Sequence, residues 1–451
     1  MRAIDRQRLH SLLQREQKRF VDERPKSKAL FERARNSLLS GVPMNWMAKW
    51  AGAFPPFVRE AQGAHFFDVD GHHYIDFCLG DTGAMTGHSP SATVSAIEQQ
   101  ARRGITLMLP SEDAIWVGEE LQKRFGLPFW QFSLTATDAN RFCIRLARQI
   151  TRRPKILVFN WCYHGTVDET FITLENSGTA KARRGNVGPP VDPATTTRVV
   201  EFNDVDSLEE ALAMGDVACV LAEPVMTNVG IVHPEAGYHN KLRELSRKYG
   251  TLLIIDETHT ICAGPGGLTR VENLEPDFLV FGKAIGGGVP GAAYGFTDEV
   301  AQQITAHHNL EDCDTGGIGG TLAGNALSLA AMRATLAKVL TKEAFDRMIP
   351  LAKRWADGVQ KAIGEFSVPW HVTWLGCRAE YLFSPNRPRN GREAHDSMDF
   401  ELERLMHLYA MNRGILLTPF HNMALMSPVT VSEDVDEHSR IFHEAIRELT
   451  S

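Results

Sequence analysis

Short apolar runs alternate with helical patterns between residue 91 and about residue 325, and this alternation constrains the fold more than any other feature. Helical patterns span 91–103 and 114–125. Such alternation predicts an α/β fold with a mostly parallel sheet covered on both faces by helices. Ligands of these sheets bind outside the carboxyl ends of the strands. The runs that predict buried strands are 129–134, 155–159, 217–221, 252–255 and 278–281.

The chain of 451 residues is too long for one simple core, so we expect two or three domains. Residues 1–75 indicate amphipathic helices broken near Pro25, then an antiparallel meander whose Asp70-Gly71 pair is typical of a hairpin turn. Residues 76–325 form the predicted large domain, and residues 326–451 indicate a smaller α+β domain.

Composition excludes several functional classes. The net charge of -7 comes from 48 basic and 55 acidic residues that are mixed along the chain, so nucleic acid is not an expected partner. No apolar run approaches the length of a membrane span, and we expect no membrane partner. An odd number of scattered cysteines without a CxxC pair predicts reduced thiols in a cytoplasmic protein, with neither a disulfide framework nor a metal site. They are Cys78, Cys143, Cys162, Cys219, Cys262, Cys313 and Cys377.

Lys283 lies in the stretch PDFLVFGKAIGGGVPGAAYG, residues 276–295. The apolar run predicts a buried strand and the glycines a tight turn, which would carry the lysine into the crevice at the strand's end. Burial lowers the pKa of a lysine and leaves a nucleophilic amine, as a covalent bond to an aldehyde cofactor requires. The alternative is a lysine at a loop edge with its amine in water.

Asp256 follows the apolar run LLII and therefore lies at the same edge of the predicted sheet as Lys283. Taken alone, it is an acidic residue that ends a strand in water. Paired with a lysine of this kind, its carboxylate can hold a pyridine nitrogen protonated and make the ring an electron sink. Pyridoxal phosphate needs this pair of residues.

Further residues at strand or helix ends fit the same cofactor. The run 132–139 passes from a strand into a helix, where small hydroxyl residues either cap the helix or bind a phosphate with the first-turn amides. Tyr163 would place a ring at the same edge, and Glu223 a carboxylate. Thr321, after Gly319-Gly320, opens a helical run and offers a second phosphate site.

With these residues the chain resembles the class III aminotransferases, which are fold-type I pyridoxal-phosphate enzymes. Within them it is similar to the branch that holds glutamate-1-semialdehyde aminomutase and β-amino acid aminotransferases. The resemblance implies a large domain with a mostly parallel sheet of the seven-stranded type, plus a smaller α+β domain built from both chain ends. Its motifs are FDVDG (67–71), CYHG (162–165), AEPV (222–225), IDE (255–257), GKAIGGGVP (282–290) and GTLAGN (320–325).

The resemblance implies roles around the cofactor. Lys283 would hold pyridoxal phosphate covalently and then move protons, Asp256 would pair with the pyridine nitrogen, and Tyr163 would lie over the ring. Glu223 would support the ring hydroxyl, and Thr258 would pack its methyl group against the ring.

Phosphate binding and assembly are implied in the same way. Thr135 and Ala136 stand where relatives have serine and glycine, and Ala136 and Thr137 would contact the phosphate. Thr321 would reach the phosphate of the neighbouring subunit, which implies a homodimer with shared active sites.

The substrate pocket departs from the family. Met47, flanked by Trp46 and Trp50, stands where many relatives place an arginine that grips a substrate carboxylate, and ICAGPGG (261–267) lacks a second such arginine. An unpaired carboxylate in an apolar pocket is costly, so an amine with an apolar body is the better substrate for this pocket.

Arg378 is the remaining candidate for binding a substrate carboxylate. The alternative is that it pairs with Glu380, which lies on the same face of the predicted strand. His421 stands where relatives line the substrate pocket, or serves structure.

These residues predict a pyridoxal-phosphate aminotransferase that moves an amino group from a primary amine, or an ω- or β-amino compound, to a keto acid by a ping-pong mechanism. The alternative is an aminomutase, which returns the amine to another carbon of the same molecule, or a racemase. A non-catalytic dimeric binding module is more remote, because such a module needs neither Lys283 nor Asp256.

Overall fold

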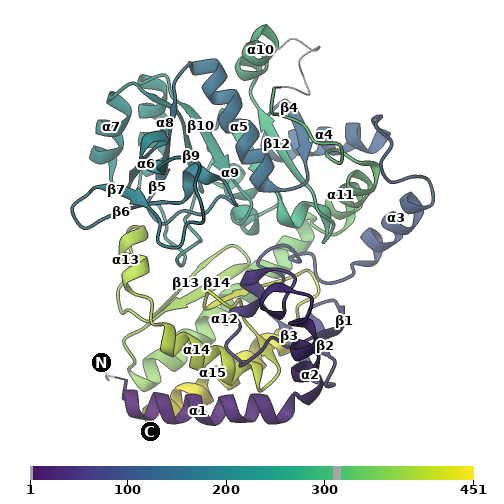
Figure 1. The fold of residues 1–451 in the computed structure, drawn as a ribbon, viewed down its shortest axis with the longest axis vertical. Coiled ribbons are helices and arrows are strands. Elements are labelled where there is room, and N and C mark those ends of the chain that lie inside the picture. Colours follow the sequence, from purple (N-terminus) through teal and green to yellow (C-terminus); the bar gives the residue numbers. More distant parts are fainter. Residues whose placement is uncertain (1–3, 308–315) are drawn as a thin grey trace. The chain divides into compact units, whose positions relative to one another are not determined.

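The computed structural model describes residues 4–307 and 316–451, and the chain forms two compact units (Figure 1). The terminal unit comprises Met1–Pro90, Asp346–Arg387 and Ser397–Ser451. The central unit comprises Ser91–Phe345 together with Pro388–Asp396. Among the described residues, no helix is long and apolar enough to cross a membrane.

The central unit is built on a seven-stranded sheet in which β12 alone runs opposite to the direction of the other six strands. Every residue of β9 and β11 is buried, and because alternate side chains face opposite sides, both faces of the sheet are covered. This confirms the predicted fold class. Across the sheet the strands are β4 (Phe129–Ser133), β12 (Ala292–Phe296), β11 (Phe278–Phe281), β10 (Leu252–Asp256), β9 (Val217–Ala222), β5 (Lys155–Phe159) and β8 (Thr197–Val200).

All five predicted strands are present, but sequence patterns did not indicate β8 and β12. β12 contains small residues and Gly295, so it reads as part of the glycine-rich turn before it. Gly295 is required there because a Cβ atom would lie 2.7 Å from the ring of Trp130, its cross-strand neighbour on β4. Glycine in a strand thus marks a close approach rather than a break.

Helices cover this sheet, and α5 packs across β4, β12, β11, β10 and β9 (Figure 1). A two-stranded sheet of β6 (Ile172–Leu174) and β7 (Ala180–Ala182) lies within the same unit. The helices of the central unit are α3 (Ser91–Ala101), α4 (Glu112–Phe125), α5 (Ala136–Thr151), α6 (Pro193–Thr196), α7 (Val205–Ala213), α8 (Tyr238–Lys248), α9 (Gly267–Val271), α10 (Asp298–His307), α11 (Ala326–Lys338) and α13 (Gly391–Asp396).

The terminal unit contains two small sheets and long helices. The predicted meander is the four-stranded sheet β1 (Val58–Gln62), β2 (His65–Asp68), β3 (His73–Asp76) and β15 (Ile415–Leu416), in which β15 joins from the far end of the chain. The second sheet holds β13 (His371–Leu375), β14 (Arg378–Leu382) and β16 (Met423–Leu425). The helices are α1 (Arg6–Glu23), α2 (Pro25–Ala34), α14 (Phe400–Met411), α15 (Ser432–Thr450) and α12 (Lys342–Phe366), which starts in the central unit.

The boundaries between these units differ from the expected 75/76 and 325/326. Phe77 extends the terminal unit, because its backbone N–H donates to Leu416 O (3.0 Å) and its carbonyl accepts from Leu425 N (2.9 Å). α11 belongs to the central unit, because it packs on α3 and α4 and Ala326 N donates to Ile105 O (3.0 Å). Tertiary pairing therefore moves both boundaries further along the chain.

Six cysteines lie among the described residues; each is buried, and none of the six forms a disulfide. Cys313 lies outside the described residues.

Candidate functional site

Lys283 and Asp256 follow neighbouring parallel strands at their carboxyl ends. Asp256 is the last residue of β10 and pairs in register with Val280 of β11, three residues before the lysine. Lys283 is half-buried, has a φ of +46° and begins the 3-10 turn Lys283–Gly286. Gly282 before it is needed, because a Cβ atom there would lie 2.8 Å from the Cβ atom of Ala136. The structure thus brings the strand end, the lysine and the start of α5 together.

The amine of Lys283 has a polar neighbour that sequence reasoning missed. Its Nζ atom lies 2.8 Å from Nε2 of His259, which follows Asp256 by three residues. A neutral imidazole at hydrogen-bond distance can accept a proton from the amine or return one. The signal was present in the run DETH, where His259 follows the strand end.

Asp256 is buried within a set of donors. Its Oδ2 atom accepts from Nδ1 of His164 (2.9 Å) and from Nδ2 of Asn140 (2.9 Å), and Oδ1 accepts from the N–H of Thr258 (3.1 Å). Burial by itself raises the pKa of Asp256, but the hydrogen bond and charge of His164 outweigh it and lower the pKa to about 2. The carboxylate is therefore ionised at neutral pH and suited to face a cationic ring nitrogen.

His164 is the counterpart of that carboxylate. Burial lowers its pKa, whereas the hydrogen bond to Asp256 raises it, and the net result is a pKa of about 10. Sequence reasoning quoted the CYHG motif but assigned no role to His164. Asn140 was also missed, although a buried polar residue on the apolar face of α5 was a signal that could have found it.

The start of α5 lies where the phosphate contacts were predicted. Thr135 is the N-cap residue: its Oγ1 accepts from Asp138 N (3.1 Å) and donates to Asp138 Oδ2 (2.8 Å). Ala136 and Thr137 are the first helical residues, and the first-turn amides of a helix have no partner within it. The hydroxyl of Thr135 is thus engaged in capping, while the amides after it are groups of the kind that can bind an anion.

Gly165 joins the CYHG loop to this helix start. Its φ is +76°, and a Cβ atom would lie 2.0 Å from Oγ1 of Thr137. The same Thr137 oxygen accepts from the N–H of Thr166 (3.0 Å). Only glycine combines this backbone conformation with so close an approach.

The remaining predicted cofactor residues of the central unit lie in different surroundings. Glu223 follows β9, is buried, accepts from the N–H of Thr227 (3.3 Å), and has its pKa raised by burial. Tyr163 is 39% exposed and packs edge-to-face on Phe171, with 6.3 Å between ring centroids. Thr258 is buried one residue past Glu257.

Thr321 is exposed and does not open a helix, contrary to our prediction. α11 begins at Ala326, and Asn325 caps it by accepting from Ser328 N (2.9 Å). Asn325, and not Thr321, caps this helix because Asn325 stands directly before the first helical residue.

The predicted substrate residues belong to the terminal unit. Trp46 and Met47 lie in the 3-10 turn Asn45–Ala48, and Trp50 packs against the aromatic cluster around Phe20 and Phe54. Trp46 is 41% exposed and contacts Phe420 edge-to-face. Trp50 therefore packs against a hydrophobic core of the terminal unit.

Arg378 and His421 both contact Glu380. Arg378 is fully buried on β14, with its guanidinium 3.4 Å from Oε2 of Glu380, and Nδ1 of His421 lies 3.2 Å from Oε1. Burial raises the pKa of Glu380, but the charges of His421 and Arg378 bring it below its ordinary value. The arginine is thus in the intramolecular pair that was the alternative to a substrate clamp.

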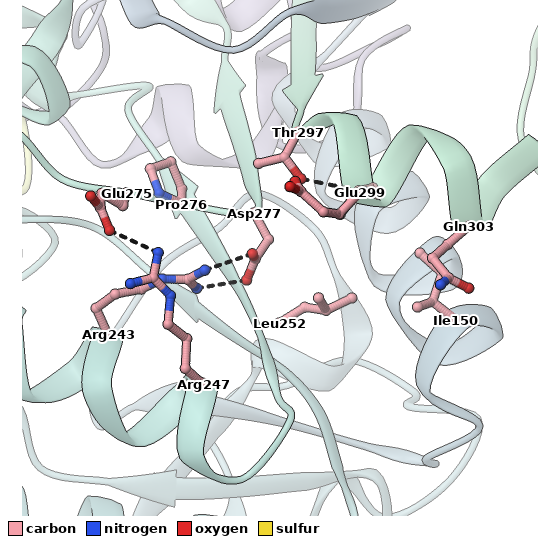
Figure 2. A pocket seen from close by; sticks show the side chains of 11 residues that line it. Ile150, Arg243, Arg247, Leu252, Glu275, Pro276, Asp277, Thr297, Glu299 and Gln303 are labelled. Atoms are coloured by element: carbon pink, nitrogen blue, oxygen red, sulfur yellow. Dashed lines mark hydrogen bonds and ion pairs between the residues drawn. The ribbon is translucent and has the colours of Figure 1, made fainter.

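A separate pocket lies at the opposite ends of the parallel strands, beside Leu252 and Asp277 (Figure 2). The positive charges of the arginines that line this pocket are balanced by neighbouring carboxylates. Arg243 makes two hydrogen bonds to Asp277 (2.7 and 2.8 Å), and Arg247 donates to Glu275 (2.8 Å). The pocket therefore has no connection with the predicted chemistry.

The residues at the carboxyl ends of the strands fit the cofactor that the sequence predicts. Asp256 is a buried carboxylate that stays ionised. The close approaches at Gly165 and Gly282 place the CYHG loop and the lysine turn against the first residues of α5. A flat ring with a phosphate and a basic nitrogen requires this combination.

Comparisons with known proteins agree with this geometry. The sequence profile of the class-III aminotransferases matches residues 46–446. The glutamate-1-semialdehyde 2,1-aminomutase of Persephonella marina is 31% identical over 416 residues, which are 90% of this chain and 95% of that protein.

Solved structures extend the similarity. A crystal structure of a glutamate-1-semialdehyde-aminomutase from Pseudomonas aeruginosa PAO1 has a TM-score of 0.97 and 51% identity, covering 99% of both chains. A lysine-to-alanine variant of that protein, in complex with PMP, has the same TM-score of 0.97. An omega-transaminase from Sphaerobacter thermophilus has a TM-score of 0.85 and 28% identity over 94% of this chain and 98% of its own.

Proposed function

This chain belongs to the class-III aminotransferases and uses pyridoxal phosphate as its cofactor, and from that premise we propose that it is an aminomutase. An aminomutase moves an amino group between two carbons of one substrate. The observation that carries the proposal is the 51% identity, over 99% of both chains, to a protein described as a glutamate-1-semialdehyde-aminomutase. The comparisons therefore support the alternative raised from the sequence better than the transaminase that we expected first.

The roles that we propose for residues of the central unit are supported by their contacts. Lys283 binds the cofactor and moves protons, with His259 at 2.8 Å as its proton partner. Asp256 holds the pyridine nitrogen protonated, and the bound cofactor then acts as the electron sink of the reaction. His164 keeps Asp256 ionised and so helps this carboxylate to hold the ring nitrogen in its protonated, cationic form.

The cofactor's other groups are assigned to the surrounding loops. The amides of Ala136 and Thr137 hold the phosphate, and Tyr163 covers the ring. Glu223 lies near the ring hydroxyl, and Thr258 packs its methyl group against the ring. Thr321 serves the phosphate of a neighbouring subunit.

A specific observation favours a second candidate, a transaminase that acts on an apolar amine. Glutamate-1-semialdehyde carries a carboxylate, whereas Met47 is uncharged and the charge of Arg378 is balanced by Glu380. An unpaired carboxylate is costly to bury. The amino donor is therefore the property that separates the two candidates.

The deciding experiment uses the protein loaded with the amino form of the cofactor. It is mixed with glutamate-1-semialdehyde in the absence of any keto acid, and the isomeric aminomethyl ketone is separated by chromatography and quantified. We expect many turnovers without an added acceptor. Lack of the isomer, together with transfer from plain amines to a keto acid, would replace the aminomutase with the transaminase.

The variant Lys283→Ala tests the central assignment. We expect a loss of turnover of at least about 10²–10⁴-fold, because the proton-transfer group is removed, and loss of the visible absorption of the lysine-bound cofactor. Lys248→Ala is the control, because this lysine lies on the same unit but pairs with the exposed Glu209. Turnover of Lys283→Ala at the wild-type rate would disprove the assignment.

A further inference from the structure

Trp161 has a backbone conformation that bulky residues rarely adopt. Its φ is +65°, in the left-handed region. It follows β5 by two residues and directly precedes the loop Cys162–Gly165, which carries Tyr163 and His164. Strained conformations of this kind persist only where the surroundings hold them, and they cluster at functional sites.

Three side chains hold Trp161 in place. The ring of His395 stacks on the indole with 3.7 Å between centroids and 17° between planes. The guanidinium of Arg183 lies 5.6 Å from the indole centroid and donates to the carbonyl of Cys162 (2.7 Å), the next residue. Nδ2 of Asn228 donates to the carbonyl of Trp161 itself (2.8 Å).

Arg183 also extends the cluster to Tyr163. Its guanidinium lies 5.9 Å from the ring of Phe171, and that ring is the one on which Tyr163 packs edge-to-face. Arg183 therefore contacts the Trp161 stack directly and is linked to Tyr163 through Phe171.

His395 comes from a segment that is remote in sequence. α13 lies in Pro388–Asp396, which the chain inserts into the central unit between two stretches of the terminal unit. Arg392 fixes this segment by donating to the carbonyls of Leu174 (3.1 Å) and Glu175 (2.8 Å). The approach is tight, because a Cβ atom on Gly391 would lie 2.0 Å from the carbonyl oxygen of Asn160.

We propose that the Trp161–His395 stack, completed by Arg183, is a clamp that positions the Cys162–Gly165 loop against the cofactor. The clamp holds the residue before the loop and the first carbonyl of the loop. Tyr163 and His164 are thereby kept where the ring and Asp256 need them. Trp161, His395 and Arg183 are positioning residues, and the proposal holds for an aminomutase and for a transaminase alike.

The test measures how the holoprotein retains its cofactor. The rate of pyridoxal-phosphate loss on dilution and the visible circular dichroism of the bound cofactor are recorded for His395→Ala and His395→Phe. An aromatic stack corresponds to about a 3- to 10-fold effect on an equilibrium. We expect His395→Ala to lose the cofactor about 3- to 10-fold faster with weaker dichroism, and His395→Phe to behave like the wild type.

A pair of variants at Trp161 separates the stack from the backbone strain. Glycine adopts a φ of +65° without strain, whereas alanine adopts it only at an energetic cost. Trp161→Gly and Trp161→Ala both remove the stack, so we expect both to lose the cofactor faster. The cofactor-free Trp161→Gly protein should have the higher melting temperature of the two.

Phe129→Ala is the control for general destabilisation. Phe129 stacks on Phe296 (6.1 Å, 25°) in the same unit, at the start of β4 and away from the cofactor loop. We expect it to lower the melting temperature while cofactor loss stays at the wild-type rate. The proposal is overturned if His395→Ala loses the cofactor at the wild-type rate and keeps the wild-type dichroism, or if His395→Phe is as defective as His395→Ala. It is also overturned if Phe129→Ala loses the cofactor as fast as His395→Ala does.

Discussion

Asp256 and His164 fix each other's charge. The pKa of Asp256 falls from 3.8 to about 2, so its contribution to stability is present above pH 3.8 and is lost as the pH falls toward 2. The pKa of His164 rises from 6.5 to about 10, so its contribution is present below pH 6.5 and is lost as the pH rises toward 10. Both contributions are therefore complete only between about pH 4 and 6.5.

This window predicts the behaviour of His164→Asn, whose amide can replace the Nδ1 donor but not the charge. For the cofactor-free protein we expect a loss of about 3 kcal/mol in the free energy of unfolding at pH 5, because a buried pair is broken. The loss should shrink as the pH approaches 10. Urea unfolding at pH 5, 8 and 9.5 measures it, and a constant loss across this range would contradict the ion pair.

Gly165 offers a second prediction for a single residue, with a matched control. Gly165→Ala and Gly178→Ala both place alanine at a positive φ, +76° and +80°, which costs roughly 1–2 kcal/mol. A Cβ atom on Gly178 meets nothing within 4 Å, whereas on Gly165 it lies 2.0 Å from Oγ1 of Thr137.

We therefore expect Gly165→Ala to cost about 1–3 kcal/mol more in unfolding free energy than Gly178→Ala. It should also weaken pyridoxal-phosphate binding, because the loop is displaced from the start of α5. Chemical unfolding and cofactor titration measure the two effects. Equal unfolding free energies and cofactor affinities of the two variants would mean that the Cys162–Gly165 loop can move to accommodate the Cβ atom without loss of stability.

At the scale of elements, α5 links the core of the central unit to the anion site. Its buried face, which includes Ala139, Cys143 and Leu146, packs across the sheet, so its first turn is held at the carboxyl ends of the strands. The sequence predicted this helix start and its hydroxyl residues. Packing against the sheet decided that the first turn meets the CYHG loop.

The caps of α5 and α7 give a matched comparison between elements. Thr135→Ala and Asp204→Ala each remove an N-cap side chain, and each should cost about 1 kcal/mol of stability. Only Thr135→Ala should reduce the affinity for pyridoxal phosphate, because α7 follows β8, an edge strand that β9 and β5 separate from β10 and Asp256. Thr135→Ser should restore both properties. Unchanged affinity in Thr135→Ala would remove the first turn of α5 from the phosphate site.

At the scale of the whole molecule, assembly stays a prediction, and we propose a homodimer in the cytoplasm. Apolar side chains of one loop of the central unit are exposed, Met108 and Leu109 each to 76%. Exposed apolar groups of this kind mark interaction sites. Since Ala326 N bonds to Ile105 O, this loop is tied to the chain that follows Thr321, the residue expected to serve a neighbouring subunit.

Light scattering should give a particle of twice the chain mass of 50.2 kDa. Leu109→Asp should shift the protein toward the single-chain mass and reduce cofactor affinity, because the charge would lie in the proposed contact between subunits. Val187→Asp is the control, since Val187 is 91% exposed elsewhere in the central unit. A wild-type particle of single-chain mass would refute the dimer.

The sequence by itself determined the strands that carry the site, and with them Lys283 and Asp256 at one edge of the sheet. Apolar runs and glycine turns are local properties, and parallel strands bring their carboxyl ends together whatever the loops do. This pair of residues predicted pyridoxal phosphate, the resemblance to a family implied the same cofactor, and the comparisons confirm it.

Only the tertiary structure decided which distant side chains meet. The pairs His164 with Asp256, His259 with Lys283, and His395 with Trp161 depend on the path of the chain, and no local pattern specifies that path. The same holds for the unit boundaries and for the pairing of Arg378 with Glu380. Propensity and periodicity act within a few residues, whereas contacts between remote segments are set by packing of the whole core.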